Sequence, residues 1–148
     1  MPSAPAAIEK ALEIALRAHR GQRDKAGAPY ILHPLRLMLA VEDEDQRLAA
    51  LLHDVVEDGG VTLEDLSREG FSPTVVAAVE ALTKREGEDY AAFIERILPN
   101  PVARRVKIAD LEDNLDVRRL PDLTVADFER IRKYLLAWHR LRGTDPCA

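Results

Sequence analysis

The stretch Leu51-Leu52-His53-Asp54-Val55-Val56-Glu57-Asp58 is the starting point for interpreting this 148-residue chain. It places one imidazole and three carboxylates in a segment whose remaining side chains, Leu and Val, are typical of a buried helix. Such polar groups are costly to bury without a partner, and a divalent metal ion suits both imidazole and carboxylate. The stretch therefore predicts a helix that carries a metal site.

Two residues far away in the sequence extend this candidate site. Taken alone, His33 is a polar residue at a helix start, and Asp110 is one end of a weakly stabilising surface ion pair with Lys107. Together with the His-Asp dipeptide they give the ligand set of a metal-dependent hydrolase. The predicted metal ligands are His33, His53, Asp54 and Asp110.

The spacing of the stretch also allows a plainer interpretation. On a continuous helix His53 and Glu57 lie one turn apart, as do Asp54 and Asp58, so the four side chains spread over one flank. The alternative is that these carboxylates only face solvent at a helix end, because a single His-Asp dipeptide is a weak signal.

Composition limits the class of protein. Apolar residues make up 47% and charged residues 32% of the chain, which predicts one globular domain over residues 1–148. The apolar runs are too short for a membrane span, the N-terminus lacks signal-peptide features, and the single Cys147 forms no internal disulfide, so we expect a cytoplasmic protein. A net charge of −5 argues against duplex nucleic acid or an anionic membrane as partner, and leaves a nucleotide possible. The oligomeric state is left open.

The periodicity of apolar residues is helical throughout, and strict alternation of apolar and polar residues occurs nowhere. We therefore predict an all-α fold, an irregular bundle of about seven or eight helices. In the last helix Phe128, Ile131, Leu135 and Trp138 share one face, and residues 21–30 form an ordered loop. The helices are expected at 1–20, 34–41, 45–57, 62–70, 72–83, 90–98, from 100 onward, and 124–143.

Several short motifs carry a family resemblance that covers roughly residues 8 to 120. In order along the chain they are Ala18-His19-Arg20-Gly21-Gln22, Gly27-Ala28-Pro29-Tyr30-Ile31-Leu32-His33-Pro34, the stretch from Ala50 to Asp58, Leu82-Thr83-Lys84, and Val106-Lys107-Ile108-Ala109-Asp110 with Asn114. This set resembles the HD superfamily of metal-dependent phosphohydrolases. It is most similar to the hydrolase domain of the bacterial alarmone synthetase/hydrolase family, which includes small stand-alone hydrolases of (p)ppGpp.

The resemblance implies an HD-type helical fold and a role for each matching residue. The four predicted ligands would hold one Mn²⁺ ion, and Glu57 and Asp58 would orient and deprotonate the attacking water. Asn114 would contact the nucleotide sugar. Among the basic residues, Arg23, Lys25 and Lys107 are the candidates for binding the substrate anion.

Four positions depart from the family pattern, which usually has basic or neutral groups there. They are Asp24, Leu111, Asp113 and Asp116. Acidic residues near a polyanionic substrate are expected to oppose its binding. We therefore expect the substrate to be the 3′-pyrophosphate of (p)ppGpp or a related nucleotide, such as a 2′- or 3′-phosphate on a dinucleotide.

The alternative from another class is a non-catalytic nucleotide-sensing or scaffold protein that retains a structural metal site. The presence of Glu57 and Asp58 argues against it, because a purely structural metal would not need two further carboxylates.

Overall fold

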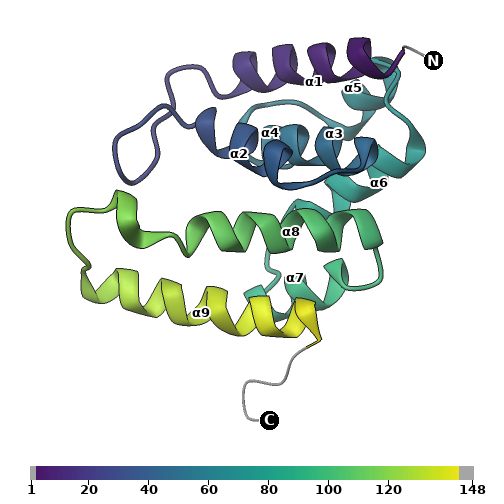
Figure 1. The fold of residues 1–148 in the computed structure, drawn as a ribbon. Coiled ribbons are helices and arrows are strands. Elements are labelled where there is room, and N and C mark those ends of the chain that lie inside the picture. The colour runs from purple at the N-terminus through teal and green to yellow at the C-terminus, as the bar shows by residue number, and fades with distance from the viewer. Residues whose placement is uncertain (1–2, 144–148) are drawn as a thin grey trace.

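Side chains that cap helices set most of the helix starts. The computed structural model describes residues 3–143, which contain nine α-helices and one 3₁₀-helix (Figure 1). These are α1 (Ala4–Ala18), α2 (Leu32–Ala40), α3 (Glu44–Leu52), α4 (Val55–Asp58), α5 (Leu63–Arg68), α6 (Pro73–Leu82), α7 (Tyr90–Ile97), α8 (Pro101–Asn114), η1 (Val117–Arg119) and α9 (Val125–Arg142). Side-chain oxygens of the preceding residue accept backbone N–H groups at Asp43, Thr62, Ser72, Asp89, Asn100 and Thr124. The predicted all-α class is confirmed.

Helix α3 lies at the centre of the bundle and contacts α1, α2, α6 and α8. Its residues 48–52 are all buried. Leu48, Leu51 and Leu52 pack into one apolar cluster with α1, α4, α5 and one face of α6, whereas Ala49 and Ala50 pack into a second cluster with α2, the other face of α6, α7, α8 and α9. Figure 1 shows the resulting order, with α1 at the top, α8 in the middle and α9 at the bottom. The fold thus has two cores, and α3 and α6 contribute residues to both.

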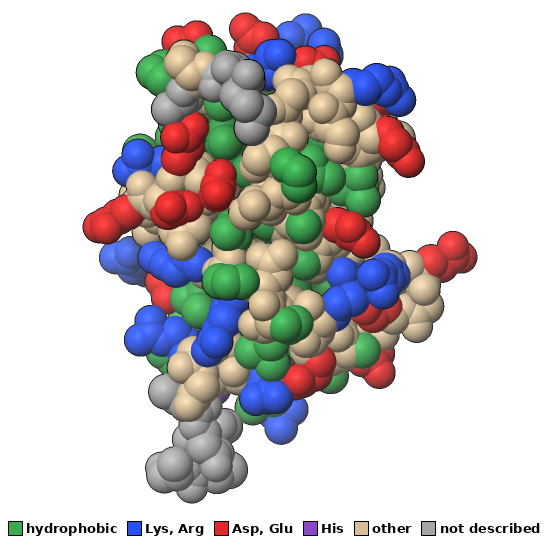
Figure 2. All heavy atoms as spheres, turned by 90° about the vertical axis from the view of Figure 1, so that its right-hand side faces the viewer, with side chains coloured by type: hydrophobic (Ala, Val, Ile, Leu, Met, Phe, Trp, Pro, Cys, Tyr) green, Lys and Arg blue, Asp and Glu red, His purple; other side chains and the backbone are tan. Residues whose placement is uncertain are grey.

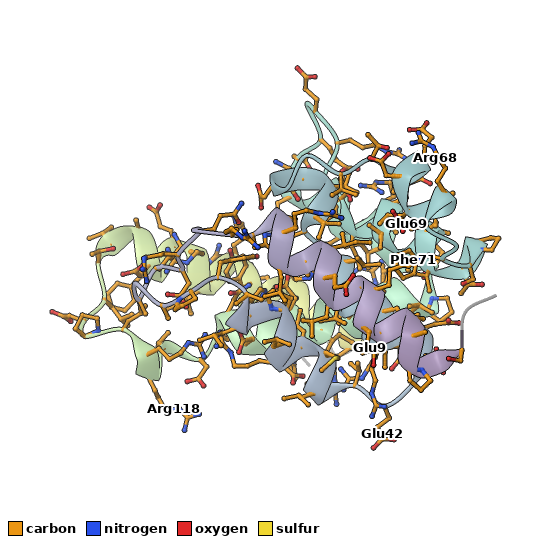
Figure 3. All side chains as sticks on the ribbon, turned by 90° about the horizontal axis from the view of Figure 1, so that it is seen from above. Glu9, Glu42, Arg68, Glu69, Phe71 and Arg118 are labelled. Carbon is orange, nitrogen blue, oxygen red and sulfur yellow. The ribbon has the colours of Figure 1, made fainter. Side chains whose placement is uncertain are left out.

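Helix α1 closes the first cluster from above. In Figure 3 it lies across the other helices, with Glu69 and Phe71 of the segment between α5 and α6 close to it. Phe71 is buried in the same cluster as α1, and the Lys10 ammonium donates to the Glu69 carbonyl at 3.1 Å. Charged groups of both signs are interspersed over the face shown in Figure 2.

The predicted helix 45–57 is wrong in one respect, because it is interrupted at the His-Asp dipeptide. Helix α3 ends at Leu52 and α4 begins at Val55, and Asp54 between them has φ −111° and ψ 0°. The imidazole of His53 folds back on α3 and donates from Nδ1 to the Ala50 carbonyl at 2.7 Å. Adjacent side chains diverge by about 100° on a continuous helix. Because of the break, the consecutive side chains of His53 and Asp54 approach each other, and His53 Nε2 lies 3.1 Å from Asp54 Oδ2.

Two smaller expectations also differ from the structure. Helix α2 begins at Leu32 rather than Pro34, and the proline sits in its first turn, where a missing N–H is tolerated. On α9 the buried Ala137 and Leu141 pack inward together with Tyr134 and the expected Trp138, whereas Phe128 and Leu135 are 59% and 46% exposed. Among the described residues, every helix is too short or too polar to span a bilayer. Cys147 lies outside the described residues.

Candidate metal centre and adjoining pocket

The four predicted ligands converge from three parts of the chain. His33 comes from α2, the His53-Asp54 dipeptide from the break after α3, and Asp110 from α8. One ligand atom from each of His33, His53 and Asp54 lies within 4.8 Å of the others. Asp110 Oδ1 is 2.8 Å from His33 Nε2 and 3.8 Å from His53 Nε2. The cluster combines two imidazoles with two carboxylates, a donor set typical of a divalent cation site.

His53 supplies the observation that best fits a metal ion. Its ring is buried and its Nδ1 hydrogen is used by the Ala50 carbonyl, so a neutral ring carries its lone pair on Nε2. This Nε2 makes no hydrogen bond within the described residues, although Asp54 Oδ2 lies 3.1 Å away. Burial lowers the pKa of His53, but the carboxylates of Asp54 and Asp110 outweigh it and raise the pKa. Because two carboxylates face this nitrogen and favour positive charge there, the position is suitable for a cation.

His33 lies between two carboxylates, one on each ring nitrogen. Its Nε2 is 2.8 Å from Asp110 Oδ1, and its Nδ1 is 2.7 Å from Asp113 Oδ2. Burial alone would lower the pKa of His33, but these hydrogen bonds raise it to about 9. The proton on His33 therefore offsets part of the negative charge of Asp110 and Asp113 in the metal-free chain, and a metal ion must displace the proton from Nε2.

Lys107 is placed differently from the expected surface ion pair. Its ammonium is 2.7 Å from Asp110 Oδ2, and the two side chains are only 13% and 7% exposed. The ammonium also lies over the rings of Phe93 and Tyr90, at 5.2 and 5.9 Å from their centroids. The carboxylate of Asp110 raises the pKa of Lys107 against the effect of burial. Lys107 is thus a charged partner of the predicted ligand.

Tyr30 is a site residue whose role the sequence did not indicate. Its hydroxyl donates a hydrogen bond to Asp54 Oδ2. Burial and the charge of Asp54 raise its pKa, so the hydroxyl keeps its proton. Asn114 reaches the same cluster, because its side-chain amide donates to Asp110 Oδ1 at 3.1 Å.

Glu57 and Asp58 lie on the single turn of α4, outside the four-residue cluster and exposed to solvent. Partial burial and the charges of Asp54 and Asp58 raise the pKa of Glu57. Partial burial and Asp54 likewise raise the pKa of Asp58. A carboxylate whose pKa is raised toward neutrality is better suited to take up a proton.

A cavity of about 290 Å³ adjoins the cluster on the side of His33. It lies between the loop of residues 21–30 and the segments around η1 and α9. Exposed Arg23 and Lys25 line it together with Asn114. Three of the four predicted substrate-binding residues therefore border one cavity, and Lys107 does not.

The departing acidic residues all have partners in the structure. Asp24 Oδ1 accepts the N–H groups of Ala26 and Ala28, each at 2.9 Å, and so holds its own loop. Asp113 pairs with Arg36, and Asp116 pairs with Arg118, which points away from the body of the molecule (Figure 3). Because these carboxylates are paired, they repel an anion less than the sequence alone suggested. Leu111 is fully buried and plays a packing role.

Comparison with known proteins identifies relatives over most of the chain. The HD domain family model matches residues 11–141. Guanosine-3′,5′-bis(diphosphate) 3′-pyrophosphohydrolases from Aquifex aeolicus and Vibrio cholerae are 34% identical over 120 residues and 39% identical over 124 residues. These matches cover 73% and 74% of this chain, and 17% of each relative. A GTP pyrophosphokinase from Streptomyces coelicolor is 34% identical over 76% of this chain and 15% of its own length. The chain thus spans about a sixth of the length of these relatives.

A solved structure is similar over nearly its whole length. It is described as a metazoan ortholog of SpoT that hydrolyzes ppGpp and plays a role in starvation responses. It superimposes with a TM-score of 0.76 and 29% sequence identity, and the match covers 99% of this chain and 90% of that one.

Proposed function

Because the chain belongs to the HD domain family, we propose that it is a metal-dependent phosphohydrolase that releases pyrophosphate from the 3′ position of (p)ppGpp or a related phosphorylated nucleotide. The observation that carries the proposal is the buried Nε2 of His53, which makes no regular hydrogen bond and faces the carboxylates of Asp54 and Asp110 beside a cavity bordered by cations. The names of the relatives and of the similar structure support this substrate class.

A divalent ion, with Mn²⁺ as the proposed metal, would be held by His33, His53, Asp54 and Asp110. Such an ion would neutralise charge on the phosphate oxygens and make a nearby water easier to deprotonate. The chain's own residues hold this arrangement in place, because the Ala50 carbonyl fixes the ring of His53.

Glu57 and Asp58 are proposed to orient the attacking water and accept its proton. Both sit one short turn after the His-Asp dipeptide, and both have a raised pKa. Neither is needed as a ligand, so each is free to exchange a proton.

The cavity beside His33 is proposed to hold the nucleotide. Arg23 and Lys25 would attract its phosphates from the exposed loop, and Asn114 would contact the sugar. Lys107 would act through Asp110, whose charge it balances. We propose a small nucleotide as the partner, rather than duplex nucleic acid or a membrane. We also propose a cytoplasmic location.

A panel of nucleotides tests this function directly. The Mn²⁺-loaded protein is incubated with ppGpp, pppGpp and a dinucleotide 2′-phosphate, and pyrophosphate and phosphate release are measured separately. We expect pyrophosphate from ppGpp. Chains with His53→Ala or Asp110→Ala should lose both bound Mn²⁺ and activity. Full metal binding without release from any nucleotide would favour the non-catalytic sensor instead.

A further inference from the structure

The two imidazoles of the candidate metal centre are oriented by different partners. In His53 the Nδ1–H donates to the backbone carbonyl of Ala50 at 2.7 Å. In His33 the Nδ1 is 2.7 Å from Asp113 Oδ2. A carboxylate only accepts, so Nδ1 of His33 carries the hydrogen. Both rings thereby direct Nε2 into the cluster, with their centroids 5.3 Å apart.

The carboxylate of Asp113 is itself held in a fixed orientation. Arg36 Nε donates to Oδ1 at 2.8 Å, and the terminal nitrogen of the same guanidinium donates to Oδ2 at 3.0 Å. Arg119 adds a longer contact of 3.5 Å to Oδ1. Asp113 is only 12% exposed, so this bidentate pairing offsets the cost of burying its charge.

Helix periodicity explains why these four groups meet. His33 and Arg36 are three residues apart on α2, and Asp110 and Asp113 are three residues apart on α8. Residues at this spacing share one face of a helix. The pair His33–Asp110 therefore faces the metal cluster, and the pair Arg36–Asp113 forms the next layer beside it.

We propose that Asp113, clamped by Arg36, is a positioning residue that fixes the tautomer and ring orientation of His33 for metal binding. This inference rests on the metal site of the proposed function. It gives Asp113 the role of orienting a metal ligand without binding the metal itself. Asp113 contacts the ring nitrogen opposite to Nε2, so it acts through His33. Carboxylate partners of this kind orient a histidine ligand and increase its basicity. The acidic residue that the sequence marked as unfavourable for an anionic substrate thus serves the metal.

Mn²⁺ affinity tests the proposal without relying on turnover. Free Mn²⁺ is measured by electron paramagnetic resonance during titration of wild type, Asp113→Ala and Asp113→Asn. We expect Asp113→Ala to raise the Kd for Mn²⁺ about 10- to 100-fold. Asp113→Asn should raise it less, because its amide oxygen still accepts from Nδ1–H. Circular dichroism verifies that each variant is folded.

Asp116→Asn is the matched control, because Asp116 lines the same cavity and pairs with arginine but has no hydrogen bond to His33. Asp116→Asn removes the same negative charge. Its Kd for Mn²⁺ should stay within about threefold of the wild-type value, because the charge is screened. An unchanged Kd in folded Asp113→Ala overturns the inference. If the alanine variant does not fold, a Kd for Asp113→Asn no higher than that of Asp116→Asn overturns it. Absence of Mn²⁺ binding by wild type would overturn the metal centre and this inference together. Mn²⁺ binding that depends on Asp113, without hydrolysis, would overturn only the proposed activity.

Discussion

The hydroxyl of Tyr30 donates a hydrogen bond to the carboxylate of Asp54, and this contact joins the loop of residues 21–30 to the candidate metal centre. The ring of Tyr30 also lies against His19 and His33, with centroid distances of 4.9 and 5.5 Å. Because burial and the charge of Asp54 raise its pKa, the phenol keeps its proton and remains a hydrogen-bond donor. The loop that carries the exposed cations is therefore connected to a predicted ligand.

Tyr30→Phe tests that connection. The substitution keeps the ring packing and removes the hydroxyl that orients Asp54, so we expect Mn²⁺ affinity to fall about tenfold. The free energy of unfolding without metal should change by only about 1 kcal/mol. Isothermal titration with Mn²⁺ measures the first quantity and urea unfolding the second. An unchanged affinity would mean that Asp54 is oriented without Tyr30.

Glu57→Gln is expected to separate chemistry from metal binding. Loss of a positioned proton acceptor should lower kcat on the best nucleotide of the panel by about 10²- to 10⁴-fold. The Kd for Mn²⁺ should stay near that of wild type, since Glu57 lies outside the ligand cluster. Glu64→Gln, an exposed carboxylate on α5, is the matched control and should keep full activity. Wild-type turnover in Glu57→Gln would assign the proton transfer to another group.

The stability of the metal-free chain should decrease as the pH rises from 6.5 toward 9. The pKa of His33 is raised to about 9 in the folded state, against an ordinary value of 6.5. Its proton stabilises the fold fully below pH 6.5, and this contribution is lost as the pH rises through 9. His53, whose pKa is also raised, acts in the same direction. The loss is on the order of 1–3 kcal/mol.

Urea unfolding at a series of pH values in the presence of a chelator measures this loss. The Mn²⁺-saturated protein is the control, and its stability should hold or increase over the same interval, because deprotonated imidazoles bind metal more tightly. A flat profile in the metal-free protein would show that His33 is neutral there.

Asp24 is expected to matter for its loop more than for its charge. Asp24→Asn keeps an oxygen that accepts from Ala26 and Ala28 while removing the negative charge beside the cavity. We expect a lower KM for ppGpp at low salt, by a few-fold, with the gain shrinking as salt increases. Asp24→Arg removes both hydrogen bonds and should raise KM despite its charge. The opposite order of the two variants would show that charge outweighs loop geometry.

Gly59→Ala should destabilise the fold by about 1–3 kcal/mol. A Cβ atom at Gly59 would lie 2.5 Å from Ala18 Cβ and 2.8 Å from the Val55 carbonyl oxygen. Helix α1 would have to move away from α4 to accommodate it. Urea unfolding of Gly59→Ala, Ala18→Gly and the double variant forms a cycle, in which Ala18→Gly should recover part of the loss. A double variant whose losses simply add would refute this contact.

Much of the fold is predictable because its signals are local. Caps such as Thr62 and Thr124 act within one turn, and the structure shows the expected helix starts. The break after Leu52 is not predictable from periodicity, because the apolar pattern continues through Val55, and the break coincides with a contact of the His53 ring with the Ala50 carbonyl. The spacing of apolar residues does not predict a contact between a side chain and the backbone of this kind.

The candidate ligands were predictable from residue type and order, but their partners were not. Asp113 contacts His33 across 80 positions of sequence, and Tyr30 contacts Asp54 across 24. The first contact depends on how α2 packs against α8, and the second on how the loop of residues 21–30 packs against the break between α3 and α4, and a single sequence does not encode either locally. The burial of the Lys107–Asp110 pair was missed for the same reason, since spacing alone is equally compatible with a solvent-exposed pair.

The break between α3 and α4 has a consequence for how such a chain changes over evolutionary time. His53 is anchored to α3 and Asp110 to α8, whereas Glu57 and Asp58 lie on a single turn with few backbone hydrogen bonds of its own. If Glu57 and Asp58 activate the water as proposed, their substitution would abolish hydrolysis while leaving the four candidate metal ligands in place. Under the proposed function, a descendant altered only at these two residues would keep the metal site and the adjoining cavity, and would change from an enzyme into a receptor through one turn of helix.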